Sequence, residues 1–145
     1  MPDVDRPVGP DSLRPTVLFL CVHNAGRSRM AAGWLRHLAG DRVAVRSGGS
    51  EPADAVNRVA VAVMAEVAID IAGDPPRRWT QSDVGQADVV VTMGCGDECP
   101  VIPGRRYEDW DLRDPSGEPI EVVRQIRDEI EKRVKELAQS ILADG

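Results

Sequence analysis

The strongest candidate for chemistry is a cysteine followed at fixed spacing by an arginine and a serine. The segment reads Cys21-Val-His-Asn-Ala-Gly-Arg27-Ser28, which is the pattern C-x5-R-S. A short loop that enters a helix directs backbone N–H groups and the positive end of the helix dipole at one point, where an oxyanion binds. Arg27 can hold two oxygens of that anion with its planar guanidinium. The same field favours a thiolate, so the pattern predicts that Cys21 is a nucleophile beside an anion site.

The other residues of this loop are expected to shape the anion site. Asn24 and Gly26 are residue types that tolerate a positive φ in a tight loop, and Ser28 can donate a hydrogen bond to the thiolate. The alternative is a structural cysteine followed by an ordinary helix cap at Ser28. A Walker-type nucleotide loop is excluded, because no Gly-Lys-Ser/Thr follows. The predicted oxyanion-binding residues are Val22, His23, Asn24, Ala25, Gly26, Arg27 and Ser28.

A second candidate is the pair Cys95 and Cys99, which form a C-x3-C pattern in a glycine-containing loop. Cysteines at this spacing can approach within the distance that a disulfide allows, and Gly94 and Gly96 would let the loop rearrange. Two inert thiols or half of a zinc site are the alternatives. Zinc usually needs four ligands, and neither histidine has a convincing ligand spacing. Redox chemistry is therefore the interpretation that we favour.

A third candidate is a carboxylate between Tyr107 and Pro115, where Asp109, Asp111 and Asp114 all occur. A carboxylic acid within reach of the anion loop would protonate a leaving oxygen. From the residues alone, Asp114-Pro115 is better explained as the turn before the last helix.

Alternating apolar runs and helical patterns predict the scaffold that positions these residues. The order predicts a three-layer open α/β sheet of four parallel strands with helices on both faces. Such sheets place their ligands at the carboxyl edge, where the first two candidate loops would meet. The predicted strands are residues 16–21, 43–46 and 88–92, with a fourth inside 105–112; the predicted helices are residues 28–39, 57–67, 81–86 and 120–142.

Length and charge restrict the class of protein. A chain of 145 residues and 15.7 kDa suits one domain, which we place at residues 16–145 after a proline-rich flexible tail at residues 1–15. The net charge of −6 argues against nucleic acid or a membrane surface as a partner. Three cysteines do not describe a disulfide framework, and no signal peptide is visible. We therefore expect a monomer in the cytoplasm.

The segment Val17–Gly33 (VLFLCVHNAGRSRMAAG) resembles the active-site segment of arsenate reductases built on the low-molecular-weight tyrosine phosphatase fold. The resemblance extends from about Thr16 to the C-terminus. It implies that Cys21 is the nucleophile, Arg27 the oxyanion clamp and Asp114 the general acid, with Asn24 and Ser28 supporting the loop. The thioredoxin-coupled branch carries two cysteines after the third strand, which Cys95 and Cys99 match.

This resemblance implies a relay of three thiols that reduces arsenate to arsenite. Cys21 attacks arsenate, Cys95 attacks Cys21 and releases arsenite, and Cys99 attacks Cys95. Thioredoxin would reduce the resulting 95–99 disulfide, and no metal or organic cofactor would take part.

The chain departs from the resembling family at several positions. Many relatives have a cysteine where this chain has Gly26, and many have a potassium-binding glutamate where it has Ala32. Its two later cysteines are also closer together than in many thioredoxin-coupled members. Three alternatives remain: a phosphotyrosine phosphatase that uses only Cys21, Arg27 and Asp114, a mycothiol-dependent arsenate reductase, and a non-catalytic sensor that binds an oxyanion or oxidises at its C-x3-C pair.

Overall fold

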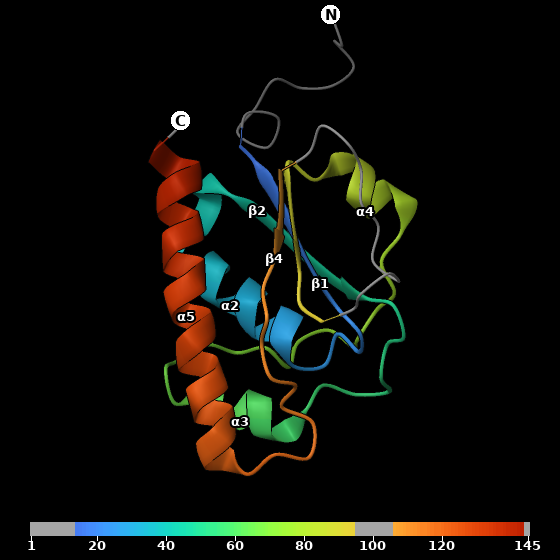
Figure 1. Ribbon diagram of the computed structural model, residues 1–145, viewed down its shortest axis with the longest axis vertical. Helices are drawn as coiled ribbons and strands as arrows, with labels where there is room; N and C mark the ends of the chain where they lie inside the picture. The colour runs from blue at the N-terminus through green and yellow to red at the C-terminus, as the bar shows by residue number, and fades with distance from the viewer. Residues whose placement is uncertain (1–13, 95–105, 144–145) are drawn as a thin grey trace, which may run out of the picture.

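A computed structural model describes residues 14–94 and 106–143, and in these ranges four strands form one sheet (Figure 1). β1 (Thr16–Cys21) lies between β2 (Ala44–Gly49) and β3 (Val89–Thr92), and β4 (Arg106–Asp109) lies beyond β3. All three pairings are parallel. The predicted four-stranded parallel sheet is confirmed.

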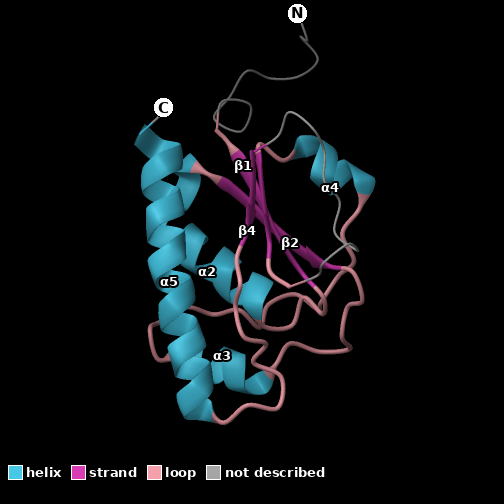
Figure 2. Ribbon diagram, in the orientation of Figure 1, coloured by secondary structure: helices cyan, strands magenta, loops and turns pink. Residues whose placement is uncertain are grey.

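Helices cover both faces of the sheet, because the strands are apolar on both sides. Alternate residues of a strand face opposite sides. Phe19 of β1 packs in a large core with α2 (Arg27–Ala39), α3 (Arg58–Ala65) and α5 (Ile120–Ala143). Leu18 and Leu20 pack on the other side against Val84 of α4 (Gln81–Gln86). Figure 2 shows α5 and α4 on opposite sides of the strands.

The helix boundaries follow local signals in the sequence. Asn57 caps α3, with its Oδ1 accepting the N–H groups of Val59 and Ala60. α5 presents a buried stripe at helical spacing that includes Ile126, Ile130 and Val134. No helix in the part of the chain that the structure describes is long and apolar enough to cross a membrane.

β2 is longer than predicted. Its Ser-Gly-Gly end was expected to terminate the strand, but the strand continues through Gly48 and Gly49. The glycines permit close contact there: a Cβ on Gly48 would lie 3.1 Å from Trp79, and one on Gly49 would lie 2.6 Å from the carbonyl oxygen of Val22. Small residues therefore allow the edge strand to approach the segment around Trp79 and the loop after β1.

The register of the strands brings their carboxyl ends to one edge. Cys21 pairs with Gly49, and Leu20 with Thr92, which pairs in turn with Asp109. The loops that begin after these residues contain the candidate anion loop and Asp114. Cys95 and Cys99 lie outside the described residues.

Candidate active site

Cys21 is the last residue of β1, and its side chain is bonded to the first turn of the next helix. Its Sγ lies 3.0 Å from the Oγ of Ser28, and both residues are buried. Ser28 is the second residue of α2, while Gly26 occupies the cap position without a side-chain hydrogen bond. The helix-cap interpretation of Ser28 is therefore wrong. Its hydroxyl is instead available to a thiolate on Cys21.

The peptide groups of the loop are oriented by the segment that follows β2. The carbonyls of Val22, His23 and Ala25 accept hydrogen bonds from Glu51, Ala53 and Asn57 respectively. The C=O and N–H of one trans peptide point in opposite directions. The N–H groups that follow these three carbonyls are consequently turned away from residues 51–57. An anion-binding loop needs peptide groups held in such a fixed orientation.

Arg27 and Asp114 meet although they are distant in the sequence. Arg27 Nη2 lies 3.6 Å from an Asp114 carboxylate oxygen, and Arg27 Nη1 donates to the carbonyl of Leu112 at 3.4 Å. Arg27 is only 6% exposed, whereas the Asp114 side chain is 45% exposed. A buried guanidinium that has further N–H donors can bind an oxyanion. An accessible carboxyl beside it is placed to act as a general acid.

These groups surround one small cavity of about 180 Å³. Its described lining contains no Phe, Tyr or Trp side chain, and the imidazole of His23 is its only aromatic ring. Val22, Asn24 and Ser28 support the loop from outside this lining. The residues that line it are Cys21, His23, Ala25, Gly26, Arg27, Ala53, Ala55, Asn57, Asp114, Pro115 and Ser116.

Two glycines allow other segments to approach the anion loop. A Cβ on Gly26 would lie 2.6 Å from Cγ of Pro115, which explains physically why this chain has no larger residue there. Gly94 has a φ of +87°, and a Cβ on it would lie 2.5 Å from Nη1 of Arg27. Gly94 is the residue that precedes Cys95. The chain that leads to Cys95 thus passes directly beside Arg27.

Sequence reasoning found Asn24 but missed the residues that hold it in place, which are Ser47, Arg77 and Asp83. Asn24 has a φ of 50° and is fully buried, and its Nδ2 donates to Ser28 at 2.8 Å and to Ser47 at 3.1 Å. Its Oδ1 accepts the backbone N–H of Arg77 at 3.0 Å. The side chain of Arg77 also pairs with buried Asp83 at 2.7 Å. The sequence contained a signal for Ser47, because this residue follows a predicted strand and therefore lies at the carboxyl edge of the sheet, where ligands bind.

Ala32 is buried, and its side chain supplies no oxygen ligand for a cation. The cavity that it lines also contains the guanidinium of Arg29. Among the residues with described positions, no group of three or more His, Cys, Asp or Glu side chains could hold a metal ion.

The fold and the anion loop agree with a comparison against protein families. Residues 16–145 match the family described as low molecular weight phosphotyrosine protein phosphatase. The chain belongs to this family.

Within the family, the chain is similar to proteins named arsenate reductase. It is 38% identical over 84% of its length to arsenate reductase 2 of Staphylococcus epidermidis, covering 95% of that protein. It is also 38% identical over 86% of its length to the glutaredoxin arsenate reductase of Synechocystis, covering 97% of it. The expected resemblance to arsenate reductases is confirmed.

Two solved structures show the same fold. The thioredoxin-dependent arsenate reductase of Corynebacterium glutamicum superposes with a TM-score of 0.81 and 41% identity over 91% of this chain. This chain spans 64% of the length of that one. The arginine phosphatase from Geobacillus stearothermophilus superposes with a TM-score of 0.80 and 28% identity, covering 90% of this chain and 94% of the other.

Proposed function

We propose that this protein reduces arsenate to arsenite with three thiols and that thioredoxin restores the reduced enzyme. The observation that carries the proposal is the contact between Gly94 and Arg27. A Cβ on Gly94 would lie 2.5 Å from the clamp, and Cys95 is the next residue in the chain. The described chain therefore reaches Arg27 at the residue that precedes Cys95. The names and similarities of the relatives support the same activity.

The first step is attack of the Cys21 thiolate on arsenate. The anion loop and Arg27 hold the oxyanion, and the hydrogen bond from Ser28 stabilises the thiolate. An arsenic–sulfur bond forms, and one arsenic–oxygen bond breaks. Asp114, which lies 3.6 Å from Arg27, gives its proton to the departing oxygen so that water leaves.

The second step transfers two electrons to arsenic. The Cys95 thiolate attacks the sulfur of Cys21, and a 21–95 disulfide forms. The electron pair of the broken arsenic–sulfur bond stays on arsenic, which leaves as arsenite. Cys99 then attacks the sulfur of Cys95, which releases the Cys21 thiolate and leaves a 95–99 disulfide. A dithiol protein reduces that disulfide and becomes oxidised itself.

Thioredoxin is the proposed reductant because the chain contains a C-x3-C pair. A reductase in which a small thiol such as mycothiol attacks Cys21 directly would not need this pair. The Corynebacterium glutamicum neighbour is a thioredoxin-dependent reductase, while the Synechocystis relative is named a glutaredoxin arsenate reductase. Parallel assays with thioredoxin, glutaredoxin or mycothiol as the only reductant separate these cases. The proposal predicts arsenite formation above background only with thioredoxin and its reductase. Turnover with mycothiol alone would contradict it.

A phosphatase is the second candidate, since the described site already contains Cys21, Arg27 and Asp114 around one cavity. The arginine phosphatase neighbour has almost the same TM-score as the reductase. The described lining contains no Phe, Tyr or Trp side chain to stack on the phenyl ring, which weighs against phosphotyrosine. Hydrolysis of an aryl phosphate and of phosphoarginine at rates well above arsenate turnover would favour this second function.

A further inference from the structure

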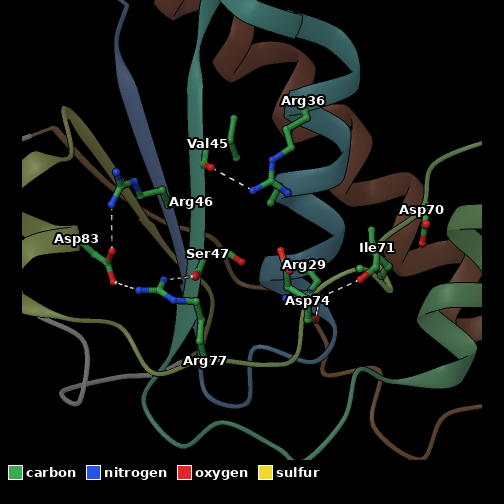
Figure 3. A pocket seen from close by; sticks show the side chains of 12 residues that line it. Arg29, Arg36, Val45, Arg46, Ser47, Asp70, Ile71, Asp74, Arg77 and Asp83 are labelled. Atoms are coloured by element: carbon green, nitrogen blue, oxygen red, sulfur yellow. Dashed lines mark hydrogen bonds and ion pairs between the residues drawn. The ribbon is translucent and has the colours of Figure 1, made fainter. Parts of the chain in front are cut away.

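A segment that lies outside the active-site cavity is tied to the anion loop. The 71–80 segment connects the region after α3 to α4, and Figure 3 shows part of it beside β2 and α2. The backbone N–H of Arg77 in this segment donates to Oδ1 of Asn24 at 3.0 Å. This hydrogen bond forms only if the 71–80 segment is held in a fixed position relative to the anion loop.

Arg29 of α2 holds one end of the 71–80 segment. Its guanidinium donates to the carbonyls of Ile71 at 3.0 Å and Pro75 at 3.4 Å, and also to the carbonyl of Asp74. Arg29 is buried, and this burial lowers its pKa, which the charge of Asp74 partly offsets. A guanidinium stays protonated in proteins. Three carbonyl dipoles therefore converge on one fixed positive charge.

Asp83 of α4 holds the other end. It is 2% exposed, and its Oδ2 accepts Nη2 of Arg77 at 2.7 Å and the backbone N–H of Thr80 at 2.8 Å. Arg46 approaches its other oxygen at 3.4 Å (Figure 3). Burial alone would raise the pKa of Asp83, but the hydrogen bonds from Arg77 and Thr80 hold it below its ordinary value. The carboxylate is therefore a charged anchor at neutral pH.

These two anchors determine which way the amide of Asn24 points. A backbone N–H can only donate, so the atom of Asn24 that meets Arg77 must be the oxygen. The amide nitrogen must then donate to Ser28 and Ser47. A thiolate on Cys21 can only accept, so Ser28 donates its proton to the Sγ 3.0 Å away while its oxygen accepts the bond from Asn24.

We infer that Arg29 and Asp83 are positioning residues for Cys21, acting through the 71–80 segment and Asn24. Neither residue touches the reacting atoms. The inference rests on the proposed role of Cys21 as nucleophile, but it does not depend on the identity of the substrate. Loss of either anchor lets the Arg77 N–H move, frees the amide of Asn24 to rotate and removes the fixed donor to the Cys21 thiolate.

Arg36 provides a matched control for Arg29. It lies seven residues further along α2 and lines the same cavity, of about 330 Å³ (Figure 3). Burial lowers the pKa of Arg36 too. Its guanidinium donates to the carbonyl of Val45 on the edge strand at 3.0 Å, however, and not to the 71–80 segment. Arg29→Met and Arg36→Met therefore remove the same charge from the same cavity.

The test measures the reactivity of Cys21 directly. The Cys95→Ser/Cys99→Ser protein contains Cys21 as its single thiol, and its rate of alkylation by iodoacetamide is followed from pH 5 to pH 9. Arg29→Met is expected to move the midpoint upward by about one pH unit, which is about tenfold slower alkylation at pH values below both midpoints. Arg36→Met is expected to stay within about twofold of the parent. Equal effects of the two variants would overturn the inference.

A double-mutant comparison shows whether Arg29 acts through Asn24. Asn24→Ala already removes the link, so adding Arg29→Met is expected to slow alkylation no further. A full additional tenfold loss in the Asn24→Ala protein would contradict the inference. Arg29→Lys, which keeps the charge and some of the donors, is expected to recover part of the rate.

Asp83→Asn tests the second anchor and remains informative if Arg29→Met folds poorly. It is expected to slow alkylation several-fold, whereas Arg46→Gln, which removes a neighbour of Asp83 outside the 71–80 segment, is expected to leave the rate unchanged. Unaltered alkylation in Asp83→Asn would exclude that anchor. Arsenate turnover by the unmodified enzyme is measured separately, so failure of the proposed function and failure of this inference give different results.

Discussion

The Sγ of Cys21 and the Oγ of Ser28 lie 3.0 Å apart, and the two residues are 2% and 0% exposed. A hydrogen bond to a charged group in such a place is worth about 1.5–3 kcal/mol. Ser28→Ala is therefore expected to slow Cys21 alkylation about ten- to a hundredfold at pH values below the midpoint of the thiol, and to lower arsenate turnover with it. Ser50→Ala is the control, because the buried hydroxyl of Ser50 has no partner in the described structure. Equal losses in both variants would exclude a specific role for Ser28.

Asp114 is expected to act on the leaving oxygen and not on the thiol. Asp114→Asn should lower kcat for arsenate about a hundredfold, which is the low end of the range for general acids, while Cys21 alkylation stays unchanged. Asp111→Asn removes an equally charged neighbour that does not line the active-site cavity. An unchanged kcat in Asp114→Asn, or an equal loss in Asp111→Asn, would show that Asp114 is only a turn residue.

Gly94 is expected to keep Arg27 in position. A side chain at Gly94 would meet Nη1 of Arg27 at 2.5 Å, so Gly94→Ala should raise KM for arsenate about tenfold or more. Gly117→Ala is the matched control: its φ of +74° gives a similar backbone strain of about 1–2 kcal/mol, but nothing lies within 4 Å of its Cβ position. Both variants should lose stability, and only Gly94→Ala should lose arsenate affinity.

Glu66 joins the end of α3 to α5 through an ion pair that depends on pH. Hydrogen bonds from Arg124 and then Arg127 lower its pKa to about 2 from the ordinary value of 4.5. Because the pKa is lower in the folded state, the pair stabilises the fold above about pH 5 and this stabilisation is lost as the pH falls toward 2.

The difference in unfolding free energy between the parent and Glu66→Gln should therefore be largest near pH 7 and disappear at low pH. Urea unfolding at a series of pH values measures it. Glu131→Gln, which removes the contact with Lys135 on α5, controls for the loss of one exposed carboxylate. An increase in this difference in unfolding free energy as the pH falls would contradict the prediction.

The part of the site that is contiguous in the sequence was predictable. Thr16–Cys21 forms the predicted strand, and a helix begins within one residue of the predicted start at Ser28. The reason is that a buried strand, a turn and an amphipathic helix each have a local pattern. That succession predicts where in the fold the anion loop lies, between the strand and the helix.

Residues that reach the site from other elements could not be found in this way. Asp114 was selected among three aspartates only by resemblance, because Asp-Pro is a common turn signal. Arg77 acts through its backbone N–H, which any residue possesses, and Gly94 acts by lacking a side chain. Such contributions depend on which segments the register of the sheet brings together, and no local pattern encodes them.

Arsenate-dependent NADPH oxidation with thioredoxin and thioredoxin reductase tests the central claim most directly. Cys21→Ser, Cys95→Ser and Cys99→Ser are assayed beside the unmodified protein at equal concentrations. The relay predicts turnover in the unmodified protein and its loss in all three variants. Even with excess thioredoxin, Cys95→Ser should release arsenite only at the background rate. Turnover that survives the loss of Cys95 and Cys99, or the absence of arsenate turnover beside rapid phosphate ester hydrolysis, would contradict it.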